Sequence, residues 1–305
     1  MRFTDLTTSL ATAILAAFAI MGPFGSLSAG QTSESPLELV RRTVQSEVAA
    51  SNGNAKVMFM DRKETPRGSQ TKLMVETHEA IAGLVIANND KPLTPEQRQA
   101  EEARLSGLAR NPEALQKKQR SEKEDAERIT RIMKALPDAF LYEADGTVAG
   151  SQEVGKAGAQ LIRLKFHPNP KYSPPTHVEQ VLTGMQGYLL IDGDQHRIAK
   201  IDGTLNKEVS FGWGIFGHLD RGGHFLVEQA QVLEGDWEIT RMSLSFTGKE
   251  LLFKSIHVKS DEVFSKFRPV PSSLSFSQGV DLLKKQEAEL DENREGTATD
   301  NSKYR

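Results

Sequence analysis

Six segments in a row decide the fold: MQGYLLID (185–192), HRIAKIDG (196–203), VSFGWGIFGHL (209–219), GGHFLVEQAQVLEG (222–235), DWEITRMSLSFTG (236–248) and KELLFKSIHVKS (249–260). They are rich in β-branched and aromatic residues, and glycine turn signals recur about every ten residues, which is typical of antiparallel strands. The segments leave no room for crossover helices, so parallel pairing is excluded among them. We expect the rest of the chain to pack around residues 184–267 or to be inserted into them.

One of these strands carries an irregularity. Its apolar residues are in one phase before Arg241 and in the other phase after it: Trp237 and Ile239, then Met242, Leu244 and Phe246. A strand that is buried on one face cannot change phase without a β-bulge or a change in the face that is covered. The pattern therefore predicts either a strongly curved sheet or two apolar layers.

Composition excludes several classes of function. The chain has 305 residues, a formal net charge of -3 and no cysteine. The absence of cysteine excludes disulfides, thiol catalysis, thiolate zinc sites and a lipid-modified N-terminal cysteine. The charge gives no whole-chain reason to bind nucleic acid, for which a basic domain is typical, so we predict no nucleic-acid partner.

Residues 1–30 are typical of an export signal. Arg2 provides a short basic start, an apolar run extends from Leu10 to Met21, and the small residues of 28–30 precede Gln31. The alternative is an uncleaved membrane anchor, although a spanning helix needs about 20 apolar residues. Both interpretations place the folded part outside the cytoplasm, in the periplasm or another extracytoplasmic compartment.

The mature chain begins with an amphipathic helix that is capped by Ser35 and has Pro36 at its first position. A hairpin and a third strand follow. Residues 94–136 then lack any β pattern and read as a pair of charged helices, the second ending in the stripe Ile129, Ile132, Met133, Leu136. This insertion is either a lid or partner-binding element or a solvated surface insertion, and charge-mixed helix faces favour the second interpretation.

Two further strands, one ending in a turn at Asp145-Gly146, lead into the main sheet. We expect one curved-sheet domain over 31–271, a helix over 272–290 and a disordered polar tail over 291–305. The predicted fold class is α+β: a large curved antiparallel sheet, similar to a half-barrel, that is covered by helices and carries the helical insertion at 94–136.

The polar residues predict no catalytic, metal or cofactor site. The seven histidines have no metal-ligand spacing; His218 and His224 flank a turn, but the sequence offers no third ligand. The Asp192-Gly193-Asp194 stretch reads as a turn, because Asp-Gly is a common hairpin dipeptide. No Ser lies in a G-x-S-x-G motif. We therefore expect a protein that is not an enzyme.

The glycine-rich segment FGWGIFG (211–217) is the most apolar part of the sheet. Its glycines mark bends where a sheet curls or where another backbone approaches. Two interpretations stay open: a corner of the core, or the wall of an apolar pocket. In the second case the ligand-binding residues are Phe211, Trp213, Ile215 and Phe216.

The order of elements resembles that of the lipoprotein-carrier superfamily of LolA and LolB, whose fold the regulatory proteins of the MucB/RseB type share. The resemblance covers about 36–267 and is carried by LELVRRTVQSEV (37–48), GYLLIDGDQHRIAKIDG (187–203) and FTGKELLFKSI (246–256). It implies a half-barrel sheet around an apolar cavity. The insertion and the proline-rich loop after Phe166 depart from a minimal carrier. The chain also resembles uncharacterised exported bacterial proteins, which implies location only.

These observations predict an exported, non-enzymatic binding module that holds a lipid or other apolar ligand on the concave face of its sheet. The alternative is a structural or protein-interaction component of the cell envelope, with a protein partner and no small ligand. The same apolar residues would fill a solid core equally well, so the two hypotheses differ in whether the sheet encloses a cavity.

Overall fold

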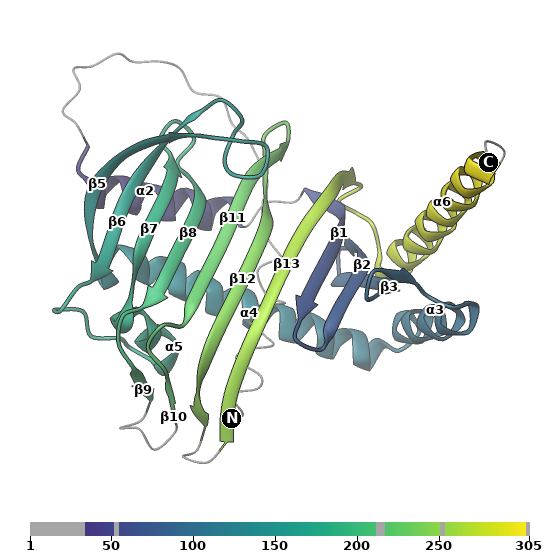
Figure 1. Cartoon of the computed structure of the whole chain (residues 1–305), viewed down its shortest axis with the longest axis horizontal. Coiled ribbons are helices and arrows are strands. Elements are labelled where there is room, and N and C mark those ends of the chain that lie inside the picture. The colour runs from purple at the N-terminus through teal and green to yellow at the C-terminus, as the bar shows by residue number, and fades with distance from the viewer. Residues whose placement is uncertain (1–33, 52–54, 212–216, 251–253, 303–305) are drawn as a thin grey trace. The chain divides into compact units, whose positions relative to one another are not determined.

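The computed structural model describes residues 34–51, 55–211, 217–250 and 254–302, with side chains as far as residue 292. The strands form one large open antiparallel sheet of 13 strands (Figure 1). The predicted α+β class, with a large antiparallel sheet covered by helices, is confirmed. The predicted signal at 1–30 lies outside the described residues. None of the described helices is both long and apolar enough to span a membrane.

The chain divides into two compact units, where the sequence predicted one domain over 31–271. Unit 1 comprises the described parts of 1–54 and 122–263, and unit 2 those of 55–121 and 264–305. The turn signals could not reveal this division, because strand β13 (Lys254–Val270) and helix α4 (Pro112–Ala139) each belong to both units without a break.

Unit 1 holds the strands that the sequence singled out. The strand order is β12-β11-β8-β7-β6-β5, and the first part of β13 pairs with β12. The strands are β5 (Phe140–Ala149), β6 (Gln160–Pro168), β7 (Met185–Asp192), β8 (Arg197–Leu205), β9 (Val209–Phe211), β10 (Gly217–Leu219), β11 (His224–Leu233) and β12 (Asp236–Glu250). Helix α2 (Pro36–Ala50), α5 (His177–Gln180), the short η2 (Val181–Gly184) and the second half of α4 complete the unit.

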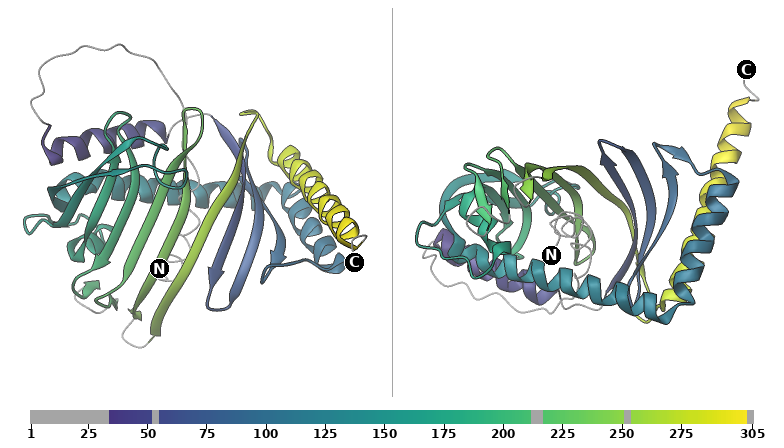
Figure 2. Two further views of the ribbon diagram at one scale, coloured as in Figure 1. Left: turned by 45° about the horizontal axis from the view of Figure 1, so that its top comes forward. Right: turned by 90° about the horizontal axis from the view of Figure 1, so that it is seen from below.

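The strands of unit 1 curve strongly, and α2 and the second half of α4 lie on the inner side of the curve (Figure 2, right). Helix α2 is anchored as predicted: Ser35 caps it, with the side-chain oxygen accepting from the Glu38 N–H. The helix buries Val40 and Val44 and contacts β5 and β8. We call the sheet face beneath these helices the inner face and the opposite face the outer face.

Unit 2 is a smaller layer of helices on strands. Strands β1 (Lys56–Thr65), β2 (Gly68–Glu76), β3 (Ile81–Asn88) and β4 (Lys91–Pro92) form an antiparallel meander. Helix α3 (Pro95–Ala109) contacts β3, and α6 (Phe276–Ser302) contacts β2, β3 and α3. Leu84, Leu105 and Phe276 are buried at the centre of this layer.

Three local expectations differ from the structure. Asp145 and Gly146 form no hairpin turn but a register shift inside β5, where Gly146 has φ 86°. Helix α4 continues past Pro137 to Ala139, so the missing N–H of the proline falls in the last turn, two residues before the end of the helix. Helix α6 runs to Ser302, through most of the tail expected to be disordered, because polar composition alone does not separate a solvated helix from a disordered chain.

The start of α3 gives a test of unit 2. The Thr94 Oγ1 accepts from the Gln97 N–H (3.3 Å), and the Gln97 side chain accepts from the Thr94 N–H (3.0 Å). We expect Thr94→Ala to destabilise this helix by about 1 kcal/mol, and Thr94→Ser to retain the cap. Hydrogen–deuterium exchange over 95–109 measures the effect; equal protection in both variants would contradict the assignment of the cap.

Candidate functional site

Unit 1 contains a cavity of about 610 Å³ between the inner face of the sheet and helices α2 and α4. Ligand pockets in proteins commonly measure about 300–1,000 Å³. The apolar residues of its wall are Val48, Ala126, Ile129, Ile132, Met133, Leu136, Phe140, Phe166, Val181, Leu182, Met185, Leu189, Ile201, Phe225, Val227, Ile239 and Phe246. The inner face is therefore covered but not filled, which answers the question that the sequence left open.

Helix α4 supplies one wall of the cavity. Ile129, Ile132, Met133 and Leu136 have the spacing of one helical face, and all four line the cavity. The charge pattern of this segment favoured a solvated surface insertion. The structure favours the covering element instead: most charged side chains of α4 are exposed, while its apolar stripe, together with Lys123, Glu127, Arg131 and Lys134, lines the cavity.

The end of α4 is fixed by hydrogen bonds to its last carbonyl groups. The Tyr142 hydroxyl donates to the Leu136 carbonyl (2.7 Å), and Asn169 donates through its side chain to Asp138 (2.9 Å) and through its backbone to Ala139 (2.9 Å). Such carbonyls have no partner inside the helix. Burial raises the pKa of the Tyr142 phenol, which keeps it a hydrogen-bond donor.

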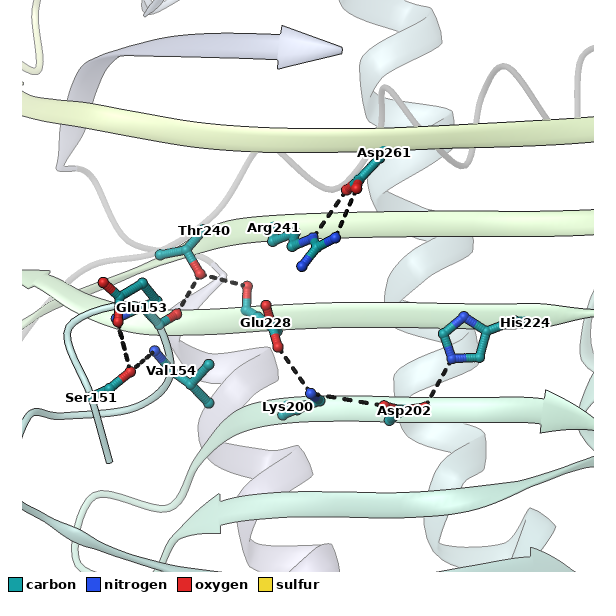
Figure 3. Close-up of polar contacts among 10 residues, drawn as sticks. All are labelled: Ser151, Glu153, Val154, Lys200, Asp202, His224, Glu228, Thr240, Arg241 and Asp261. Atoms are coloured by element: carbon teal, nitrogen blue, oxygen red, sulfur yellow. Dashed lines mark hydrogen bonds and ion pairs between the residues drawn. The ribbon is translucent and has the colours of Figure 1, made fainter. Parts of the chain in front are cut away.

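The strands supply the opposite wall through alternate residues. On β11, Phe225, Val227 and Gln229 line the cavity, as expected for side chains that alternate between the two faces of a strand. The residue between the last two, Glu228, pairs instead with Lys200 of β8 (2.9 Å). Figure 3 shows this pair in a row of polar contacts on the outer face.

The phase shift near Arg241 is a β-bulge, one of the two explanations that the sequence left open. Glu228 pairs with Arg241 and Gln229 with Ile239, so Thr240 is an extra residue in β12. The Thr240 hydroxyl donates to the Glu153 carbonyl (2.6 Å), which ties the bulge to the loop before β6 (Figure 3). Because a bulge bends its strand and increases the local twist, this one contributes to the curvature that forms the cavity.

A buried carboxyl group reaches the cavity from α2. Glu47 is 3% exposed, and its Oε1 accepts from the Ile198 N–H (2.6 Å) and the Arg197 Nε (3.2 Å). Its second oxygen, Oε2, is buried and has no hydrogen-bond partner among the residues that the structure describes. Burial raises the pKa of Glu47, while the nearby Arg197 guanidinium lowers it by a smaller amount.

A second buried polar side chain, with an oxygen that has no hydrogen-bond partner among the described residues, lies on β11. Gln229 is 6% exposed and lines the cavity, and its Oε1 has no partner within the described parts of the chain. Both groups were visible in the sequence as polar residues on apolar faces. Glu47 follows Val44 by three residues in the stripe of α2, and Gln229 follows Phe225 and Val227 in the alternation of β11. Neither residue was predicted from the sequence.

The residues that the sequence proposed as ligand-binding are only partly described. Phe211 is 4% exposed and belongs to the same core cluster as Leu182 and Met185, which line the cavity. Trp213, Ile215 and Phe216 lie outside the described residues. A role of these four in binding therefore stays a prediction.

Among the residues that the structure describes, we assign no catalytic arrangement to the acidic and histidine side chains. Asp192 caps a turn, with its Oδ1 accepting from the N–H groups of 194 and 195, as the turn interpretation predicted. His224 pairs with Asp202 (2.9 Å). His218 lies with Glu208 and Asp220, with ligand atoms within 4.8 Å of one another. Exposed carboxylates commonly gather without a metal, so we assign none.

Comparison with known proteins gives fold-level likenesses only. No protein-family model matches the sequence, and no curated protein is significantly similar to it. The chain is similar to a solved domain from Vibrio parahaemolyticus described as an outer membrane lipoprotein-sorting protein, at 12% identity and a TM-score of 0.28, over 76% of this chain and 91% of that chain. It is also similar to a DUF1329 family protein from Desulfovibrio piger, at 10% identity and a TM-score of 0.28, over 76% and 90%.

The order of elements predicted a weak resemblance to lipoprotein carriers, and the structural comparison finds such a weak likeness. At a TM-score of 0.28 it carries no weight for function, which has to be argued from the cavity.

The raised pKa of Glu47 predicts a pH dependence of stability. Because the folded state holds this proton more tightly than the unfolded state, the free energy of unfolding falls as the pH rises from about 4.5 through the raised pKa. The variant Glu47→Gln does not titrate here, so the stability of wild type relative to this variant should decrease over that window.

The measurement is urea unfolding at a series of pH values, followed by tryptophan fluorescence, since Trp237 is buried in unit 1. Glu228→Gln on the outer face is the matched control. If the free energies of unfolding of wild type and Glu47→Gln change with pH in parallel, the pKa of Glu47 is the same in the folded and unfolded states, which contradicts the prediction.

Proposed function

We propose that this protein is a non-enzymatic binding module that holds a lipid or other apolar ligand in the cavity of unit 1. The observation that carries the proposal is the cavity itself, about 610 Å³ with walls of aliphatic and aromatic side chains. Empty apolar space costs stability because its lining lacks contact partners, and cavities of this kind take up apolar molecules. A bound apolar molecule recovers those contacts.

Native mass spectrometry after gentle purification is the direct test of ligand occupancy. A reproducible mass increment that extraction identifies as lipid supports the proposal. A clean ligand-free mass that does not change on adding lipid contradicts it. That result would favour the alternative of an envelope component with a protein partner.

Filling the cavity with a larger side chain should weaken the binding of an apolar ligand. Ala126→Trp from α4 and Val227→Trp from β11 each place a large side chain into the space that both residues line. We expect either change to weaken the binding of the fluorescent apolar probe N-phenyl-1-naphthylamine by about tenfold or more, a loss of at least about 1.4 kcal/mol.

The matched control is Leu141→Trp. Leu141 lies on β5 between two residues that line the cavity, but it is 44% exposed, as expected for a side chain on the other face of the strand. We expect this control to bind the probe like wild type. Equal probe affinity in the blocked variants and the control would place the binding elsewhere and contradict the proposal.

Phe211, Trp213, Ile215 and Phe216 keep their proposed role as additional apolar surface for the ligand. Support comes from the neighbourhood of β9, which contacts η2, and η2 in turn contributes Val181 and Leu182 to the cavity wall.

We also propose that the protein is exported and acts in the periplasm or another extracytoplasmic compartment. Support comes from the apolar run and small residues of 1–30. We expect the intact mass of protein from the producing cells to correspond to a chain that begins at Gln31. A full-length chain in the membrane fraction would indicate an anchor, and a full-length chain in the cytoplasm would contradict export.

A further inference from the structure

The cavity wall is mostly apolar. Its polar residues are Glu47, Ser51 and Gln229, together with Lys123, Glu127, Thr130, Arg131 and Lys134 of α4. Glu47 binds the backbone N–H of Ile198 on β8. Two residues further along β8, Lys200 pairs in register with Glu228, which is the neighbour of Gln229 on β11. The Ile198 N–H that Glu47 binds on β8 and Gln229 on β11 therefore lie at nearly the same level of these two adjacent strands. The residues Val181, Leu182 and Phe246, which also line the cavity, come from other segments.

Glu47 and Gln229 both line the cavity, and each carries a buried side-chain oxygen. Glu47 Oε2 and Gln229 Oε1 have no hydrogen-bond partner in the described part of the chain, and their residues are 3% and 6% exposed. Unpaired buried polar atoms are rare in folded proteins, and they commonly mark the place of a water molecule or ligand group. In a wall that is mostly apolar, two such oxygens mark a place for the polar end of a ligand.

The chemistry of these atoms selects the head group. Oε1 of Glu47 already accepts two hydrogen bonds, so any proton on this carboxyl group resides on Oε2. A primary amide has two N–H donors and an acceptor, so it satisfies Oε2 with or without that proton and also donates to Gln229. A hydroxyl has one proton: it accepts from protonated Glu47 while donating to Gln229, and it donates to one of the two oxygens when Glu47 is ionised. A carboxylate or phosphate can only accept and carries the same charge as ionised Glu47, while an ether or a hydrocarbon donates nothing.

We propose that the ligand is an amphiphile with one apolar body and an uncharged hydroxyl or amide head, and that Glu47 and Gln229 bind this head. This inference rests on the proposed function, because it specifies which ligand the cavity takes. It makes Glu47 and Gln229 the residues that determine specificity, and the apolar wall the part that provides most of the affinity.

The test compares ligands that share a chain and differ only in the head. Dodecanol, dodecyl methyl ether and dodecanoate are titrated at one pH against the protein loaded with N-phenyl-1-naphthylamine, and displacement of the probe gives each affinity. A net hydrogen bond contributes about 0.5–1.5 kcal/mol, so dodecanol should bind about threefold to tenfold more tightly than the ether. Dodecanoate should bind more weakly than dodecanol.

Variants test whether Glu47 and Gln229 cause the preference for dodecanol over the ether. Gln229→Leu and Glu47→Gln should each reduce the ratio of dodecanol to ether affinity, while the affinity for the ether stays within about twofold. Glu228→Gln is the control, since this residue neighbours Gln229 but pairs with Lys200 on the outer face. Gln229→Leu removes no ion pair, so it keeps the test valid if Glu47→Gln fails to fold.

The possible results separate this inference from the proposed function. Equal binding of dodecanol and the ether, tighter binding of dodecanoate, or a preference that Gln229→Leu leaves unchanged would each overturn the assignment of the head group while leaving the apolar cavity as a binding site. Failure of the probe and of all three compounds to bind would overturn both proposals together.

Discussion

Helix α4 passes into strand β5 without a connecting residue: the helix ends at Ala139 and the strand begins at Phe140. This continuity, with the hydrogen bonds from Tyr142 and Asn169, fixes one end of the helix against the sheet. The apolar stripe of α4 must then face the inner surface, because no loop is available to let the helix rotate. The second cover, α2, contacts β5 and β8. Two helices held in this way cover a curved sheet of unit 1 without filling the space beneath them.

The buried carboxyl group of Glu47 has a structural cost that its contacts only partly offset. Removing a charged group from water is unfavourable unless it is paired and hydrogen-bonded. Here Arg197 and the Ile198 N–H satisfy one oxygen and attach α2 to the start of β8. An apolar residue at this position alone would leave the buried Arg197 guanidinium without this ion pair, so Glu47 also has a structural role.

The sequence predicted those features that depend on local pattern. Alternation along the chain identified the strands, and the change of phase around Arg241 located the bulge at Thr240 to within one residue. The spacing from Ile129 to Leu136 identified the stripe of α4, although charge composition pointed to a solvated insertion. Composition describes the whole surface of a helix, whereas the function of this helix depends on the side that meets the sheet.

The features that the sequence could not predict depend on distant contacts. Whether the inner face encloses a cavity or a filled core depends on how closely α2 and α4 approach the sheet, and apolar side chains are needed in both cases. The division into two units was hidden for a similar reason, since β13 and α4 both continue across the boundary. Glu47 and Gln229 were detectable as polar residues on apolar faces, but only the structure shows that both line the cavity.

The polar and apolar parts of the cavity wall differ in how they interact with water. Polar groups in a cavity bind water where space allows it, whereas aliphatic and aromatic side chains do not. A ligand that displaces such water must replace its hydrogen bonds, or it loses affinity. Against the apolar part of the wall, a ligand displaces no favourable hydration and gains contact with side chains that lack partners. In the proposed binding mode, affinity therefore comes mainly from the apolar body, and the hydrogen bonds to Glu47 and Gln229 orient the ligand.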